Sequence, residues 1–373
     1  MKAWPILGIA FIQCIFLLDN WFLYYTWISF CGHPAPVPDL ALRAALLVLA
    51  FSFVVAALLS FHWANALVRV IYLVASLWLG LLNFLFWGAC LSWFAWGALL
   101  LSRIVPDAAR HRPLIAWFFL VCAFGASFYG LLNARRVRVR HIPIRLPNLP
   151  ASWRGRRALL VSDLHLGHIN ALRFSRRIAT FAAGLQPEII FLPGDVFDGT
   201  KIDPECVVAP FRQLAPPFGI YFSTGNHDEF GDTNHFLAAL AGAGIRVLAN
   251  EKVVVDGLQI LGVPYHDTTF PIRLRASLQA MNIDRGSASI LLSHVPNRLP
   301  IVEEAGVSLQ LSGHTHGGQF VPFTWLTRRV FGKFTHGLHW FGNLQVYTSY
   351  GAGTWGPPLR VGTSAEMVLL TLE

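Results

Sequence analysis

The chain has 373 residues, of which 54% are hydrophobic, with a formal net charge of +9 and five cysteines. This length allows two domains, and five scattered cysteines exclude a small scaffold that depends on a disulfide framework. The positive charge does not indicate nucleic-acid binding, because eight arginines are concentrated between Arg135 and Arg157, beside an apolar segment. From residue 158 onwards, 15 basic side chains stand against 17 acidic ones.

The N-terminal part of the chain is built from apolar segments that are each long enough to cross a bilayer. They cover about residues 4–30, 40–61, 67–105 and 113–132. The first has no clear cleavage site and therefore predicts an uncleaved anchor. The third is about twice the length that one span needs, so it predicts either one long helix or a hairpin turning near residues 83–88. We therefore expect a polytopic membrane domain over residues 1–134, with four or five spans.

A basic segment, residues 135–156, is predicted to be a juxtamembrane linker. Two interpretations of its arginines stay open: a charge cluster that sets the orientation of the spans, and a patch that lies on anionic lipid headgroups. Because the cluster directly follows a span, it favours a cytoplasmic catalytic domain in a multi-pass protein of a bacterial inner membrane. Four spans with a cytoplasmic N-terminus agree with this side, whereas five spans reverse it.

Residues 157–373 alternate short apolar runs with helical periodicity, which is typical of an α/β domain. Several runs end in polar residues, namely "RALLVSDLHLG", "EIIFLPGDVFDG", "GIYFSTGNHDEF", "ASILLSH" and "VSLQLSGHTH". In such a domain the active residues are expected at the carboxyl ends of the strands. The closing run "SAEMVLLTLE" predicts an edge strand.

The polar strand ends carry the residues of a metal site. His314 and His316 in "LSGHTHGGQ" are two positions apart after a strand, so both imidazoles can face one point. The whole set is Asp163, His165, Asp195, Asp198, Asn226, His227, Asp228, His294, His314 and His316. Imidazole with carboxylate suits a pair of Mn, Fe, Zn or Ni ions better than magnesium alone. Two such ions, roughly 3.5–4 Å apart, activate a hydroxide for in-line attack on phosphate.

These motifs resemble the calcineurin-like metallophosphoesterase superfamily over about residues 157–373. The resemblance implies a four-layer domain, a double β-sandwich flanked by helices, with two divalent ions of which Mn is favoured. It implies Asp163, His165 and His316 at one ion, Asn226, His294 and His314 at the other, and Asp195 as the bridge. It also implies that His227 helps to protonate the leaving group and that Asp198 orients His227.

More narrowly, "LSGHTHGGQ" and "GAGTWGPPLR" look like membrane-associated bacterial phosphodiesterases. That branch is similar to UDP-2,3-diacylglucosamine pyrophosphatases and to multi-span transmembrane metallophosphoesterases. The resemblance implies a membrane-anchored phosphodiesterase or pyrophosphatase for a lipid-linked or nucleotide-linked substrate. The alternatives are a tethered phosphodiesterase for soluble substrates and a non-catalytic sensor that binds metal or nucleotide. Membrane lipids and a phosphate-containing substrate are the expected partners; neither nucleic acid nor a protein partner is inferred.

Candidates for substrate contact lie near the metal-ligand motifs. His168 follows "DLHLG" and Arg360 follows "TWGPP", and both are weaker candidates for binding phosphate. Residues 318–342 combine aromatic side chains with three basic ones, Arg328, Arg329 and Lys333. This segment is interpreted either as a cap packed on the core or as an interfacial flap that accepts an acyl chain or lies on headgroups.

Overall fold

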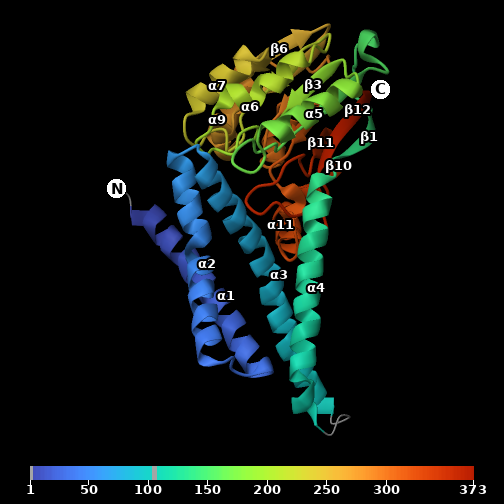
Figure 1. Cartoon of the computed structure of the whole chain (residues 1–373). Helices are drawn as coiled ribbons and strands as arrows, with labels where there is room; N and C mark the ends of the chain where they lie inside the picture. The colour runs from blue at the N-terminus through green and yellow to red at the C-terminus, as the bar shows by residue number, and fades with distance from the viewer. Residues whose placement is uncertain (1–2, 103–106) are drawn as a thin grey trace. The chain divides into compact units, whose positions relative to one another are not determined.

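The computed structural model describes residues 3–102 and 107–373 (Figure 1). The described chain divides into two compact units. The helical unit extends to Leu132 and includes Gly356–Leu359. The α/β unit comprises Asn133–Trp355 and Arg360–Glu373.

The helical unit contains long apolar helices: α1 (Ala3–Cys31), α2 (Pro36–His62), α3 (Ala66–Ser102) and α4 (Arg112–Arg135). Among the described residues, four helices are long and apolar enough to cross a membrane. The expected boundaries of the spans agree with these helices within a few residues, except that residues 103–105 lie outside the described part.

The third apolar stretch is one continuous helix of 37 residues, so the predicted alternative of a hairpin near residues 83–88 is wrong. No proline interrupts this stretch, and an apolar environment favours an unbroken ladder of backbone hydrogen bonds. Gly88 lies close to the backbone of α4, since a Cβ atom there would be 3.2 Å from the Phe119 carbonyl oxygen. The glycine therefore serves close helix packing rather than a turn.

The α/β unit contains two six-stranded sheets with the strand orders β1-β12-β2-β3-β4-β5 and β10-β11-β9-β8-β7-β6. The strands of the first sheet are β1 (Arg138–Ile144), β2 (Arg157–Leu160), β3 (Ile189–Leu192), β4 (Ile220–Phe222), β5 (Ile245–Val247) and β12 (Glu366–Leu372). Those of the second are β6 (Glu251–Val255), β7 (Leu258–Gly262), β8 (Ser289–Leu292), β9 (Leu309–Ser312), β10 (Gly337–Phe341) and β11 (Leu344–Thr348). The accompanying α-helices are α5 (Leu172–Gly184), α6 (Pro204–Val208), α7 (Thr233–Gly242), α8 (Tyr265–Thr269), α9 (Pro271–Ala280), α10 (Leu299–Glu304) and α11 (Phe323–Phe331).

Three apolar clusters show that these elements form four layers. One joins residues of both sheets, such as Phe191 and Leu311, and fills the space between them. A second packs α5 and α7 on the outer face of the first sheet, and a third packs α9 and α10 on the second sheet. Because both faces of each sheet are covered, the inner strands are apolar without alternation. The predicted double β-sandwich flanked by helices is confirmed.

Strand β12 is not the edge strand that its terminal position suggested. Its neighbours are β2 on one side, antiparallel, and β1 on the other, parallel. The edge is instead formed by β1, which belongs to the segment expected to be a linker. Alternation of arginine with apolar residues in "RVRHIPI" allows Ile144 to be buried while Arg138 is exposed. Arginine and Pro143 are side chains that an edge strand tolerates.

Candidate metal centre

The predicted ligand residues lie in loops that follow β2, β3, β4, β8 and β9. Five of them have left-handed backbone conformations, which residues other than glycine rarely adopt. Their φ angles are 53° at Asp163, 47° at His165, 54° at Asp195, 69° at His314 and 46° at His316. Each such residue costs about 1–3 kcal/mol and persists only where the surrounding structure imposes it, which is common at functional sites.

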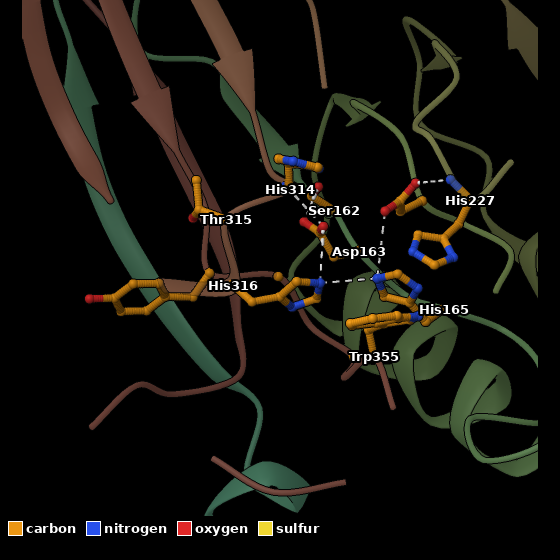
Figure 2. A network of polar contacts seen from close by, with 12 residues as sticks. Ser162, Asp163, His165, His227, His314, Thr315, His316 and Trp355 are labelled. Carbon is orange, nitrogen blue, oxygen red and sulfur yellow. Dashed lines mark hydrogen bonds and ion pairs between the residues drawn. The ribbon is translucent and has the colours of Figure 1, made fainter. Parts of the chain in front are cut away.

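The first group of ligand atoms belongs to Asp163, His165 and His316, and all three lie within 4.8 Å of one another. The Nε2 atoms of His165 and His316 are 3.0 Å apart, and His316 Nε2 is 3.5 Å from Asp163 Oδ1 (Figure 2). Asp163 is completely buried, and its second oxygen accepts a hydrogen bond from Ser162. Two imidazole nitrogens and one carboxylate oxygen thus converge on one point.

The second group contains Asp195, His294 and His314, again with ligand atoms within 4.8 Å of one another. His294 Nε2 lies 3.1 Å from Asp195 Oδ2. Asn226 Oδ1 is 2.9 Å from His314 Nδ1, so the predicted carboxamide ligand also reaches this group. Asp195 additionally lies near His165 of the first group, with 3.6 Å between Oδ2 and His165 Nε2. Asp195 therefore stands between the two groups.

The surroundings of His294 favour a positive charge between this ring and Asp195. Its Nδ1 is 2.8 Å from the carbonyl oxygen of Pro193, so Nδ1 is assigned the proton that this hydrogen bond needs. In a neutral ring, Nε2 then has no proton and turns its lone pair toward Asp195. Two acceptors then face each other in a buried place. Burial lowers the pKa of His294, but the Asp195 carboxylate raises it to about 9. Positive charge, from a proton or from a metal ion, is thus favoured between them, so this donor set suits a metal.

His314 and Asp195 have the charge states that metal binding requires. Burial and the neighbouring His294 lower the pKa of His314 to about 3, so this imidazole is neutral near pH 7. Burial raises the pKa of Asp195, but His294 and His165 outweigh that effect and hold it below its usual range. The bridging candidate is therefore ionised.

Glycines next to the ligands allow the loops to approach closely. A Cβ atom at Gly313 would lie 1.9 Å from Ser162 Oγ and 2.1 Å from Asp163 Oδ2. A Cβ atom at Gly225 would lie 2.1 Å from Asp195 Oδ1. Neither position has room for a side chain, so both glycines are needed for this arrangement of carboxylates.

Asp228 holds two ligand loops together, a role for which the sequence motif alone provided no signal. Its carboxylate is completely buried and accepts hydrogen bonds from the backbone N–H groups of Asp195, Gly225 and Phe197, at 2.6, 2.8 and 2.9 Å. The loop after β3 is thereby fastened to the loop after β4. Asp228 thus positions Asp195 through the backbone.

His227 lies at the margin of both ligand groups, with its backbone N–H donating to Asp195 Oδ1 at 2.9 Å. Its ring Nδ1 is 3.0 Å from the backbone carbonyl oxygen of Asp198. The contact of Asp198 with the His227 ring uses its backbone carbonyl group, and its orienting role in catalysis stays a prediction. The Asp198 carboxylate faces His165 instead, with 3.3 Å between Oδ1 and Nδ1. A hydrogen bond to the carbonyl fixes the His227 ring so that Nε2 points away from Asp198.

The two weaker candidates are both buried. Arg360 is 0% exposed, and its guanidinium group donates to the carbonyl oxygens of Tyr350 and Gly353 at 2.7 Å. It also lies 3.3 Å from His316 Nδ1 and so supports a ligand loop, while its role in binding phosphate stays a prediction. His168 is 5% exposed, and its role in binding phosphate stays a prediction.

Comparison with known proteins identifies the family. The sequence model described as calcineurin-like phosphoesterase matches residues 156–318. A protein from Aquifex aeolicus named "uncharacterized metallophosphoesterase" is 30% identical over 267 residues, which cover 68% of this chain and 98% of the relative. The chain belongs to the calcineurin-like metallophosphoesterase family. It is accordingly a hydrolase that acts on phosphoesters.

Two other relatives of this metallophosphoesterase have similar coverage. One, from Campylobacter jejuni, is named an uncharacterized metallophosphoesterase and is 29% identical over 70% of both chains. The other, from Danio rerio, is named "transmembrane protein with metallophosphoesterase domain" and is 28% identical over 84% of this chain and 74% of its own. Together with the four apolar helices, this likeness indicates a membrane protein.

Proposed function

We propose that this metallophosphoesterase is a two-metal phosphodiesterase or pyrophosphatase of the membrane, acting on a lipid-linked or nucleotide-linked substrate. The observation that supports this proposal is the pair of adjoining ligand groups, with Asp195 between them and His227 at their margin. A single metal needs only one such group, and a structural site is commonly closed by its protein ligands. Two groups that share a carboxylate suit phosphoryl transfer.

The residues of this chain would hold two divalent ions, with Mn favoured. Asp163, His165 and His316 would hold the first, Asn226, His294 and His314 would hold the second, and Asp195 lies where it could serve both. When bound, the ions neutralise charge on the phosphoryl oxygens and lower the pKa of a water molecule. The fixed Nδ1–H of His294 keeps its Nε2 directed at Asp195, which orients this ligand before any ion arrives.

His227 is the proposed acid for the leaving group. Its Nδ1–H donates to the Asp198 carbonyl oxygen, so Nε2 is the atom that meets the substrate. Burial and the neighbouring His165 lower the pKa of His227. A phosphate anion beside Nε2 acts in the opposite direction and favours the protonated ring. His227 would then give its Nε2 proton to the departing oxygen.

Two partly exposed aromatic side chains flank His227 and provide a surface for the leaving group. The ring centroids of Phe230 and Trp355 lie 5.1 and 5.6 Å from that of His227. Phe230 is 46% exposed and Trp355 51%, and Figure 2 shows Trp355 beside His165. Such a pair suits a leaving group with an apolar or ring-containing portion. This agrees with a lipid-linked or nucleotide-linked ester.

The test is hydrolysis of a chromogenic phosphodiester by the purified full-length protein, first stripped of metal and then supplied with Mn. We expect Mn-dependent turnover that falls by about 10²-fold or more in His227→Asn, while both ions are retained. Asp195→Asn should lose turnover together with metal. His235→Asn, an exposed histidine paired with Glu205, is the matched control and should behave as wild type.

Metal content, measured alongside turnover, shows whether the ligand assignment is correct. Full metal loading with wild-type turnover in Asp195→Asn would contradict the assignment. If wild-type protein with two bound ions hydrolysed neither this diester nor lipid-linked and nucleotide-linked substrates, the proposed function would be wrong.

A further inference from the structure

Helix α11 directs its apolar side outward. Phe323, Leu326 and Val330 are spaced i, i+3 and i+7, so they lie on one face, and they are 45%, 60% and 66% exposed. Trp325 beside this face is 68% exposed, and no residue of the helix is buried. An amphipathic helix of a soluble domain normally packs its apolar face on the core. Here Phe323 contacts the ring of Phe320, with 5.5 Å between the centroids, whereas Leu326 and Val330 stay largely exposed.

The inner side of α11 is attached directly to the metal centre. The ring of Phe331 lies 6.1 Å from that of His314, measured between centroids. A Cβ atom at Gly318, two residues after His316, would be 2.3 Å from the carbonyl group of Phe323. Thr315 Oγ1, between the two ligand histidines, donates to the carbonyl oxygen of Thr335 at 2.8 Å. The helix is thus held by the ligand loop while its apolar face remains exposed.

The charged side chains on α11 and next to it in the sequence are all basic. Arg328 and Arg329 lie on the helix and Lys333 follows it, whereas the sequence contains no Asp or Glu between Glu304 and Glu366. Glu366 itself is completely buried and pairs with Arg140 and His336. Basic side chains beside exposed tryptophan and aliphatic residues are typical of helices that lie in the interface of an anionic bilayer.

Covalent connection keeps the α/β unit near a bilayer. Helix α4 ends at Arg135 and strand β1 begins at Arg138, so only Arg136 and Val137 intervene. Two extended residues span about 7 Å, which is less than one Debye length at physiological salt. A bilayer surface is therefore always within reach of this unit.

We propose that α11 docks into the headgroup region of an anionic bilayer and presents lipid-linked phosphates to the metal centre. The apolar face of Phe323, Leu326 and Val330 would enter the boundary between headgroups and acyl chains. Arg328, Arg329 and Lys333 would contact anionic headgroups. The docking is independent of turnover, whereas the delivery of lipid phosphates rests on the proposed function.

Docking is tested with the full chain in nanodiscs of phosphatidylcholine with 30% phosphatidylglycerol. The five native cysteines are replaced, and an environment-sensitive fluorophore is attached to Leu326→Cys. The control is Val254→Cys, which is 61% exposed on β6, at the edge of the second sheet opposite β10. We expect brominated acyl chains to quench the label at position 326 and not at 254. Absence of quenching at position 326 overturns the proposal. A doubling of the particle mass together with a label that is shielded from lipid also overturns it, because a second copy of the chain would then cover the helix.

Delivery is tested by comparing a bilayer-embedded fluorescent phosphodiester with a water-soluble one. The double variant Leu326→Glu/Val330→Glu and the double variant Arg328→Gln/Arg329→Gln should each lower the ratio of lipid to soluble turnover by about tenfold or more. Val254→Glu should leave this ratio unchanged. An unchanged ratio in both double variants overturns delivery by α11. If wild type hydrolyses neither substrate, the proposed function fails, and the quenching experiment still decides whether the helix docks.

Discussion

At the scale of single residues, the site depends on buried groups that hold the ligand loops in place. Asp228 binds three backbone N–H groups, and Arg360 binds carbonyl oxygens around the ligand loop of His316. Both side chains are completely buried. Five ligand residues with positive φ are a second sign of this dependence, because their conformations need external support. The ligands are therefore placed by hydrogen bonds from neighbouring loops.

Arg360→Met should destabilise the protein rather than weaken substrate binding. The carbonyl oxygens of Tyr350 and Gly353 would lose their donors in a buried place, which costs about 2–4 kcal/mol in the free energy of unfolding. Thermal unfolding in detergent and metal content measure this effect. A variant with wild-type melting temperature and metal content but a raised KM would instead show that Arg360 contacts the substrate. Arg360→Lys, which retains the charge without the planar fork, should recover only part of the stability.

At the scale of secondary-structure elements, strand β1 decides where the catalytic domain begins. It covers one edge of β12 with parallel pairing from Arg138↔Glu366 to Ile144↔Leu372. A soluble fragment that starts at residue 133 should therefore fold, whereas one that starts at residue 157, the boundary predicted from the sequence, exposes the apolar strand β12. Size-exclusion chromatography measures the difference as monomer against aggregate. Monomeric, metal-binding protein from the shorter fragment would show that β1 is dispensable.

Glu366, the first residue of β12, makes the stability of this edge dependent on pH. Burial raises the pKa of Glu366, but the hydrogen bond from His336 and the charge of Arg140 outweigh it, so the pKa lies below the ordinary value of 4.5. A carboxylate with a depressed pKa stabilises the folded protein at pH values above its ordinary pKa. This stabilisation is lost as the pH falls from the ordinary pKa to the depressed one. The free energy of unfolding of metal-stripped protein should thus decrease below pH 4.5, and less steeply in Glu366→Gln. Equal slopes for the two proteins would exclude this role.

At the scale of the whole molecule, the four described helices that are long enough to cross a membrane would place both ends of the helical unit on one side. We propose that this side is cytoplasmic, because the arginine cluster that follows α4 lies there. An alkaline phosphatase fused within the loop after α1, at Pro34, should then be active outside the cytoplasm. A green fluorescent protein at the C-terminus should fluoresce, and so should one inserted after Ala64. Phosphatase activity at the C-terminus would place the metal centre on the other side.

The sequence alone determined the features that depend on local pattern. Long apolar stretches require helices in a bilayer, so the membrane helices were predictable from composition. The apolar runs before "SDLH", "GDVFD", "GNHD" and "GHTH" predicted strands of an α/β domain with active residues at their carboxyl ends. The structure brings Asp163, His165, Asp195 and the four other predicted ligands together.

The features that only the tertiary structure decided are those that depend on contacts between distant segments. An arginine-rich segment joined the sheet as β1 because a strand at the end of the chain offered it an unpaired edge. Asp198 contacts His165 with its carboxylate and His227 with its backbone carbonyl group. A sequence motif gives the residue type but not which of these two groups makes each contact. The third apolar stretch was too long to assign without knowing that α3 is unbroken and that its Gly88 approaches Phe119 of α4. Residue pattern specifies which groups are available, whereas long-range packing specifies which atom of each group faces the site.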